Sequence, residues 1–134
     1  MTKEELAEKA VEYKHSGYNC AQAVAKTLSD EFGFDTENIL KMTSGFAGGM
    51  GTMEATCGAL IGANLIAGIK TAGSGTIMKS MALHRSFTEL CGASICKDLK
   101  GRDTGVMKCS CDEWIITQYV VFVKRITYFY VYLY

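Results

Sequence analysis

Hydrophobic residues recur at three- and four-residue intervals in several separate stretches of the chain, which is the spacing of one face of an α-helix. The clearest stretch is 57–69, whose apolar stripe consists of Leu60, Ile61, Leu65, Ile66 and Ile69. Comparable patterns predict helices over about 3–16, 20–32, 36–42 and 77–90, a helical turn over 94–99 and a final helix from about 112. The chain contains no proline, so nothing of that kind interrupts these helices. The pattern therefore predicts an all-α bundle of about five to six helices, in a single domain covering residues 1–134.

Short polar motifs mark where these helices begin and end. Three capping boxes, in which a Ser, Thr or Asn is followed three residues later by Glu or Gln, predict helix starts at Thr2–Glu5, Asn19–Gln22 and Ser110–Glu113. Gly17 and Gly33 are placed to end the first two helices. We expect Thr56 to be the N-cap of the helix over 57–69, which puts Cys57 in its first turn.

The C-terminal stretch 115–134 is apolar and rich in Val, Tyr, Phe and Thr, which prefer strands, yet no partner strand is evident upstream. Its conformation therefore stays open. Lys124 and Arg125 lie at its centre, and each costs about 2.5–3.5 kcal/mol at mid-membrane, so we reject a transmembrane span. An apolar tail needs to be covered, and we expect Tyr128–Tyr134 to pack against another subunit in a homodimer.

Composition narrows the class of protein. The 14 Lys and Arg residues balance the 14 Asp and Glu residues, which gives no electrostatic case for nucleic acid or an anionic membrane surface. The charged N-terminus carries no apolar signal segment, so we expect a cytoplasmic protein. In that compartment the six cysteines are expected to be metal ligands or redox thiols rather than a disulfide framework.

Four cysteines fall at places that suit metal binding. Cys20, Cys57 and Cys109 lie at or just before predicted helix starts, and Cys96 lies in the helical turn. Soft thiolate ligands select iron–sulfur clusters, zinc or copper(I). The spacings are neither the paired C-x-x-C of zinc fingers nor the runs of ferredoxins. A buried, inert core cysteine is the alternative for Cys20.

The helix after Cys57 carries two glycines on one face, Gly58 and Gly62, four residues apart. Each costs about 1 kcal/mol of helix propensity relative to Ala, so a compensating role is expected. Either another helix packs closely here, or the glycines clear space around a reactive Cys57 and contact a cofactor. The glycine-rich stretch 44–51 lacks the Gly-Lys-Ser/Thr of a phosphate-binding loop, and we interpret it as a close approach to this helix.

The motifs Asn19-Cys20-Ala21, Phe46-x-x-Gly49-Met50-Gly51 and Cys57-Gly58-Ala59-x-x-Gly62, followed by Cys96-Lys97-Asp98-Leu99 and Cys109, resemble the C_GCAxxG_C_C family of redox-active proteins. The resemblance covers about residues 17–114. It implies a small helical domain, a redox role and a functional set of Cys20, Cys57, Cys96 and Cys109. It also suggests an iron–sulfur or other metal centre. Cys91 and Cys111 fall outside this set.

Three hypotheses follow. The first is a redox protein that binds an iron–sulfur cluster through the four cysteines and passes electrons to an unknown partner protein, with Gly58 and Gly62 bonding cluster sulfurs. The second is a thiol–disulfide protein in which Cys57 attacks and another cysteine resolves. The third is a structural zinc module that mediates assembly. Nothing in the sequence indicates a carboxylate pair or a Ser–His pair, so hydrolysis has no support.

Overall fold

The computed structural model describes residues 1–115 of the chain. Within them the helices are α1 (Lys3–His15), α2 (Cys20–Phe32), α3 (Thr36–Thr43), α4 (Gly58–Lys70), α5 (Thr76–Cys91) and α6 (Cys96–Lys100), with a π-helical turn η1 (Gly49–Met53) between α3 and α4. The chain is helical again from Cys111 to Ile115. The described residues contain no β-sheet, and the all-α prediction is confirmed. The expected contact of Tyr128–Tyr134 with another subunit lies outside these residues.

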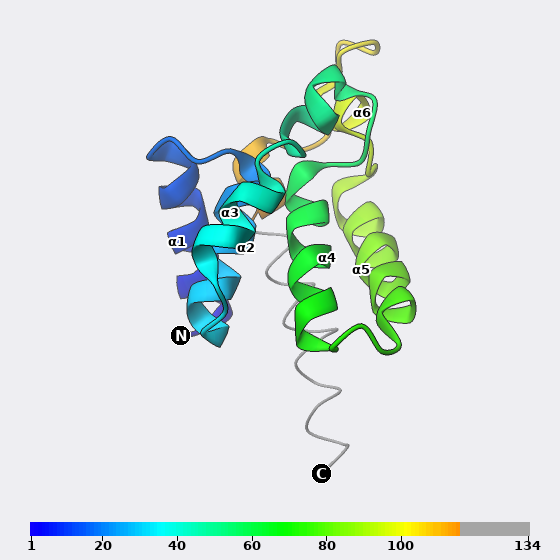
Figure 1. Cartoon of the computed structure of the whole chain (residues 1–134). Helices are drawn as coiled ribbons and strands as arrows, with labels where there is room; N and C mark the ends of the chain where they lie inside the picture. Colours follow the sequence, from blue (N-terminus) through cyan, green and yellow to red (C-terminus); the bar gives the residue numbers. More distant parts are fainter. Residues whose placement is uncertain (116–134) are drawn as a thin grey trace.

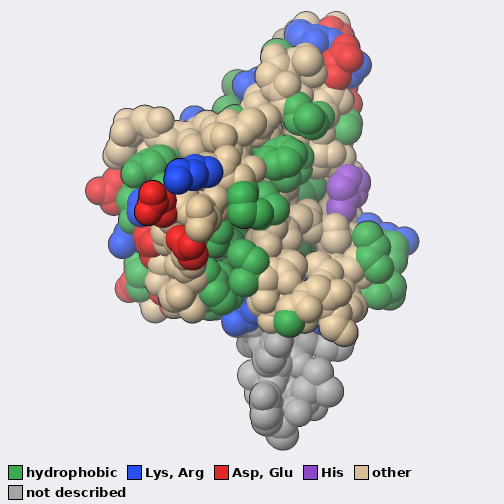
Figure 2. All heavy atoms as spheres, viewed as in Figure 1, with side chains coloured by type: hydrophobic (Ala, Val, Ile, Leu, Met, Phe, Trp, Pro, Cys, Tyr) green, Lys and Arg blue, Asp and Glu red, His purple; other side chains and the backbone are tan. Residues whose placement is uncertain are grey.

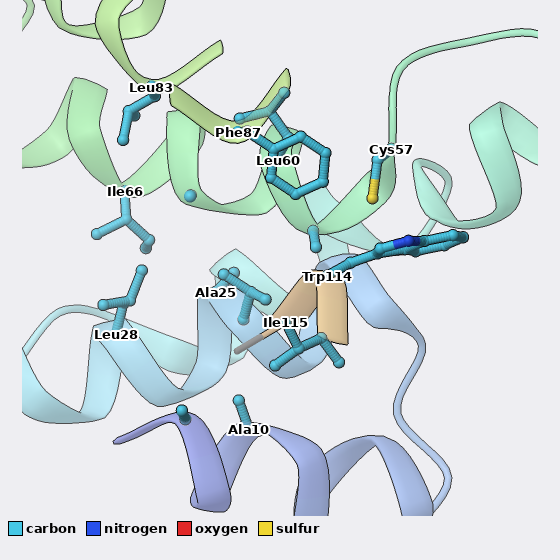
Figure 3. Packing of buried hydrophobic residues seen from close by; sticks show 14 of the residues in the cluster. Ala10, Ala25, Leu28, Cys57, Leu60, Ile66, Leu83, Phe87, Trp114 and Ile115 are labelled. Atoms are coloured by element: carbon cyan, nitrogen blue, oxygen red, sulfur yellow. The ribbon is translucent and has the colours of Figure 1, made fainter. Parts of the chain in front are cut away.

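Helices α2 and α4 form the centre of the arrangement (Figure 1). Helix α2 contacts α1 and α3 on one side and α4 on the other, and α4 in turn contacts α5. The short α6 and η1 contact each other at one end of this layer, at the top of Figure 1. Side chains from all the long helices, together with Trp114 and Ile115, fill one hydrophobic core (Figure 3). No helix in the described part of the chain is both long and apolar enough to cross a membrane.

The helix ends follow the sequence signals closely. The capping boxes of α1 and α2 are both formed, and Ser110 and Glu113 make the third one reciprocally. Gly33 ends α2 in the left-handed conformation that glycine adopts without strain. The prediction for Thr56 is wrong: the N-cap of α4 is Cys57, whose side chain makes no capping bond, and the helix begins at Gly58. Thr56 instead forms an isolated antiparallel bridge with Ile95.

The close approach predicted for Gly62 is present. A Cβ atom on Gly62 would lie 2.6 Å from the Ala21 carbonyl oxygen, a distance that real Cβ atoms essentially never show. The absence of a side chain therefore lets α4 rest directly on the backbone of α2. Helix packing is the structural reason for this glycine, and no open space lies beside it for a cofactor.

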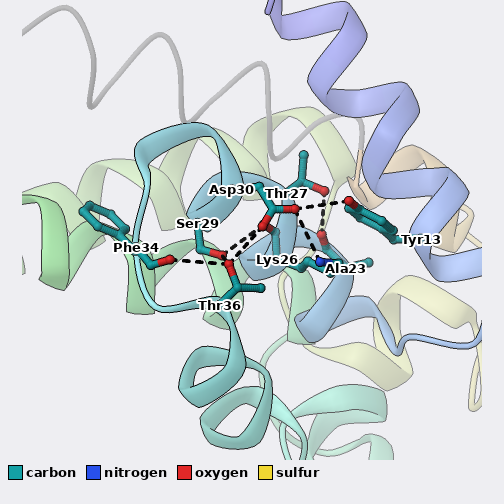
Figure 4. Close-up of polar contacts among 8 residues, drawn as sticks. All are labelled: Tyr13, Ala23, Lys26, Thr27, Ser29, Asp30, Phe34 and Thr36. Atoms are coloured by element: carbon teal, nitrogen blue, oxygen red, sulfur yellow. Dashed lines mark hydrogen bonds and ion pairs between the residues drawn. The ribbon is translucent and has the colours of Figure 1, made fainter.

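A polar network on α2 joins this helix to its neighbours (Figure 4). The Tyr13 hydroxyl of α1 donates to the Asp30 carboxylate over 3.1 Å, and Lys26 pairs with the same carboxylate over 3.4 Å. The Thr36 hydroxyl, at the start of α3, donates to the other Asp30 oxygen over 2.9 Å. The Asp30 carboxylate of α2 thus bonds to side chains of α1 and α3 as well as to Lys26 of its own helix.

Elsewhere the surface is mixed. On the face in Figure 2, acidic and basic side chains are interspersed, in keeping with the zero net charge. Ile77, Met78, Met81 and Leu90 of α5 are large apolar residues that are exposed to solvent.

Candidate functional site

Two of the candidate cysteines are positioned by the backbone rather than by side-chain packing. The Thr56–Ile95 bridge aligns two distant segments, and the Cys57 N–H donates to the Ser94 carbonyl over 2.8 Å. The Cys96 N–H donates to the Ala55 carbonyl over 3.0 Å. A helix starts at each cysteine, because Cys57 is the N-cap of α4 and Cys96 is the first residue of α6. The two thiols are therefore held at the same end of the molecule.

Cys20 reaches the same region as the first residue of α2. The Asn19 cap fixes this end twice, because its side chain accepts from the Gln22 N–H and its amide group donates to the Ser44 carbonyl. A Cβ atom on Gly58 would lie 2.8 Å from the Cys20 sulfur. Gly58 therefore clears the space that the Cys20 thiol occupies beside the start of α4.

Gly49 of η1 has the same relation to Cys96. A Cβ atom at Gly49 would lie 2.8 Å from the Cys96 Cβ and 3.0 Å from the Ala55 carbonyl oxygen. The turn around it is conformationally demanding, since Met50 and Met53 adopt the left-handed region with φ angles of 58° and 63°. Non-glycine residues rarely adopt that region, and such strain concentrates at functional sites. The glycine-rich loop thus packs directly against a candidate ligand.

The Thr56–Ile95 bridge and the contact of Gly58 with the Cys20 sulfur bring three of the cysteines near one another, and their charges affect one another's pKa values. Burial raises the pKa of Cys57 well above its ordinary value, and negative charge on Cys20 and on Cys96 raises it further. The pKa of Cys96 is raised by burial and by Cys20 and Cys111, while Lys100 lowers it. The structure therefore groups Cys20, Cys57 and Cys96, and brings Cys111 to the edge of that group.

The helix end lowers the pKa of the Cys57 thiol, but burial raises that pKa by more. The N–H groups of Ala59 and Leu60 interact with the Cys57 thiol and lower its pKa. Cys57 has no exposed surface, and the cost of burying a thiolate is larger than this stabilisation. A metal ion bound at Cys57 would outweigh the effect of burial, because a thiol that coordinates a metal ion is deprotonated.

Trp114 is a residue of this site that the sequence analysis missed. Its ring is buried, and the indole N–H has no hydrogen-bond partner among residues 1–115, which is unusual for a buried donor. Figure 3 shows the Cys57 sulfur directed toward this ring. Trp114 follows Cys111 by three residues in a helical segment, so both side chains lie on one face, and that spacing was the available signal.

Cys109, the remaining expected ligand, lies beside Cys91 in the hydrophobic core. Its thiol is 3.2 Å from the sulfur of Cys91, and both side chains are buried. Burial, the neighbouring Cys91 and the Glu113 carboxylate, as hydrogen-bond acceptor and as charge, together raise the pKa of Cys109 to about 12. Cys91 and Cys111, which the four-cysteine pattern leaves out, thus both lie beside cysteines that it includes.

The donor set and its surroundings fit a thiolate-bound group. The thiols are soft ligands, two glycines leave room for them, and a buried N–H lacks an acceptor. Within residues 1–115, no three Cys, His, Asp or Glu side chains converge closely enough to hold a single metal ion.

These features define a helical protein with a buried centre of several cysteines contributed by separate segments. Residues 18–125 match the sequence model of the family described as "Putative redox-active protein (C_GCAxxG_C_C)", and the chain belongs to this family. The match continues past Trp114 into the apolar tail. No curated protein and no solved structure matches the chain.

Proposed function

We propose that this protein binds an iron–sulfur cluster through Cys20, Cys57 and Cys96 and exchanges electrons with a partner protein. The observation that carries the proposal is the grouping of three thiols from three separate segments around a buried region that also contains an unpaired indole N–H. Membership of a family described as redox-active also supports a redox function. When bound, the cluster supplies one-electron chemistry that no side chain here offers by itself.

Cys111 and Cys109 compete for the role of fourth ligand. Cys109 belongs to the set implied by the family resemblance. We favour Cys111, because its charge raises the pKa of Cys96, whereas the Cys109 thiol contacts the sulfur of Cys91. Cys111 also lies in the same helical segment as Trp114, whose N–H is free to donate.

The protein residues have distinct tasks in this proposal. The backbone bridge fixes the separation of Cys57 and Cys96, and the Asn19 cap fixes Cys20. The Ala59, Leu60 and Trp114 N–H groups surround Cys57 with donors, and hydrogen bonds to cluster or thiolate sulfurs raise the reduction potential. Cys20 is 9% exposed whereas Cys57 and Cys96 are at most 1% exposed, so the Cys20 side is the shortest route for electrons to leave.

The test is purification without oxygen, followed by measurement of iron, inorganic sulfide and visible absorption per chain. We expect a brown protein whose absorption bleaches on reduction, and a Cys57→Ser variant that is colourless. Cys111→Ser and Cys109→Ser form a matched pair: the first loses iron and the second retains it. Loss of iron in Cys109→Ser alone would instead assign the fourth ligand to the family pattern.

Two other results would replace the proposal. A colourless protein with one zinc per chain would establish the structural zinc module. A metal-free protein that cycles between dithiol and disulfide, and stops when Cys57 is changed to Ser, would establish thiol–disulfide chemistry at Cys57.

A further inference from the structure

Cys91 and Cys109 form a second pair of thiols whose places are fixed independently of the first group. Cys91 is the last residue of α5, and Gly92 ends that helix with a φ angle of 84°. Cys109 directly precedes the capping box of the final helical segment, where Ser110 and Glu113 bond each other's backbone N–H groups. The two sulfurs are 3.2 Å apart.

Hydrogen bonds also fix residues 92–108, the segment between the two cysteines, near both of its ends. The Lys108 N–H donates to the Leu99 carbonyl over 3.0 Å, and the Lys108 ammonium group donates to the Gly92 carbonyl over 3.3 Å. These contacts bring the residue before Cys109 against the residue after Cys91. The proximity of the sulfurs is thus a property of the backbone, and a small movement, from 3.2 Å to the roughly 2.05 Å of a disulfide bond, joins them.

We propose that Cys91 and Cys109 are a redox-active dithiol pair, which a low-molecular-weight disulfide converts to an intramolecular disulfide. The pair goes beyond the iron–sulfur centre, and it uses Cys109, which that centre leaves free when Cys111 is the fourth ligand. Cys109 is the entry point, because 9% of its surface is exposed against 3% for Cys91.

The reaction is two successive thiol–disulfide exchanges. The Cys109 thiol loses its proton to solvent, and the Cys109 sulfur attacks one sulfur of the small disulfide. A mixed disulfide forms and the first small thiolate leaves. The Cys91 sulfur then attacks Cys109, the Cys91–Cys109 bond forms, and the second small thiolate leaves. The two leaving thiolates take up the two protons, so two protein thiols are oxidised while one small disulfide is reduced to two thiols.

The disulfide encloses the segment that carries Cys96. Residues 92–108 become a closed loop, and Cys96 lies within it at the start of α6. Oxidation of the pair therefore restricts a segment that also supplies a ligand to the first site. Residues 91–109 would then take part both in disulfide formation, through Cys91 and Cys109, and in cluster binding, through Cys96.

The experiment treats the full-length protein, purified without oxygen, with oxidised glutathione and follows intact mass and free thiols. We expect the chain to lose two hydrogen masses and two thiols, to retain no glutathione, and to recover both thiols with dithiothreitol. Cys91→Ser removes the resolving thiol, and this variant is expected to retain one glutathione on Cys109. That trapped adduct is a signature that a merely structural cysteine pair does not give.

Assignment of the bond needs variants as well as peptides. Trypsin leaves Cys91 and Cys96 together in peptide 86–97, and Cys109 and Cys111 together in peptide 109–124. The double variant Cys96→Ser/Cys111→Ser is therefore expected to form the cross-link although it has lost iron. The double variant Cys91→Ser/Cys109→Ser is expected to retain iron and form no cross-link between these peptides.

The opposite pattern would overturn the proposal by assigning the bond to Cys96 and Cys111. Unchanged mass and thiol content in the wild-type protein would also overturn it, and this result needs no variant to fold. Iron content and cross-linking are separate measurements, so failure of the dithiol pair is distinguishable from failure of the iron–sulfur centre.

Discussion

Three glycines of α4 lie in three different surroundings, which makes this helix a test of what each glycine does. Gly58 adjoins the Cys20 sulfur and Gly62 adjoins the Ala21 carbonyl, whereas at Gly68 no atom from another part of residues 1–115 lies within 4 Å of the place where a Cβ would stand. Substitution of each by Ala adds the same single carbon. The helix propensity gained is similar in all three, so differences between the variants report the surroundings.

The magnitudes separate the variants. Ala at Gly68 gains about 0.5–1 kcal/mol of stability, because it enters open space and restricts the unfolded chain. Ala at Gly62 meets backbone atoms of α2 at 2.6 Å, and these cannot rotate away. Overpacking of this kind costs about 1–3 kcal/mol, which the gain in propensity offsets in part. We therefore expect Gly62→Ala to be about 1–3 kcal/mol less stable than Gly68→Ala.

The assay is urea or thermal unfolding of the metal-free proteins, followed by circular dichroism at helical wavelengths. For a chain of this size, 1 kcal/mol corresponds to a shift in Tm of about 4 °C. Gly68→Ala should melt above the wild type and Gly62→Ala below it. A Gly62→Ala protein as stable as Gly68→Ala would refute the close packing of α4 on α2.

Gly58→Ala adds a second readout. Its Cβ would lie 2.8 Å from the Cys20 sulfur and 3.0 Å from the Phe46 carbonyl oxygen, so the thiol has to move. We expect iron per chain after reconstitution to fall below that of Gly62→Ala, even where the two variants have similar stability. Full iron content in Gly58→Ala would show that Cys20 does not need this space.

Three further predictions concern other residues. Asn19→Ala removes the cap of α2 and its bond to the Ser44 carbonyl, and we expect a loss of about 1 kcal/mol in urea unfolding; an unchanged midpoint would contradict the capping role. Trp114→Phe keeps an aromatic ring but removes an N–H that could donate a hydrogen bond to the proposed cluster or its thiolates. Because such hydrogen bonds raise the reduction potential, the potential of the proposed cluster, measured by redox titration, should become more negative. An unaltered potential would exclude Trp114 as a donor. The pKa of Tyr13 is raised first by burial and then by Asp30, so the neutral hydroxyl stabilises the fold below the unfolded pKa of about 10, and this stabilisation is lost as the pH rises through the folded pKa. In Asp30→Asn the pKa of Tyr13 should fall, which ring NMR signals recorded against pH will measure. An unchanged pKa would contradict the pairing of Tyr13 with Asp30.

The helical elements could be predicted because their signals are local. Capping boxes, the Gly33 stop and the spacing of apolar residues each act within a few residues, and all three appear in the structure. The exception, Thr56, is instructive. It matches the preferred residue type for an N-cap, but its backbone pairs with Ile95, a contact between distant segments that no local pattern records.

The candidate site was only partly predictable for the same reason. The position of Cys20 and Cys57 at helix starts follows from local signals, and their coupling follows from the packing of α2 on α4. The pairing of Cys109 with Cys91 depends on how residues 92–108 fold back, which sequence spacing does not reveal. The net pKa of Cys57 also depends on burial, a property of the whole core that the position of Cys57 at a helix start does not reveal.

The dispersal of Cys20, Cys57 and Cys96 among three segments has a consequence for the lifetime of the protein. A group bound by all three ties α2, α4 and α6 to one another, much as a covalent staple does, and it has to be released before the chain can open fully. Binding to the folded chain alone also shifts the unfolding equilibrium in proportion to the affinity. Under the proposed iron–sulfur function, chains without the cluster should therefore be degraded faster by cellular proteases than chains that hold it, and the amount of protein would follow the supply of iron–sulfur clusters.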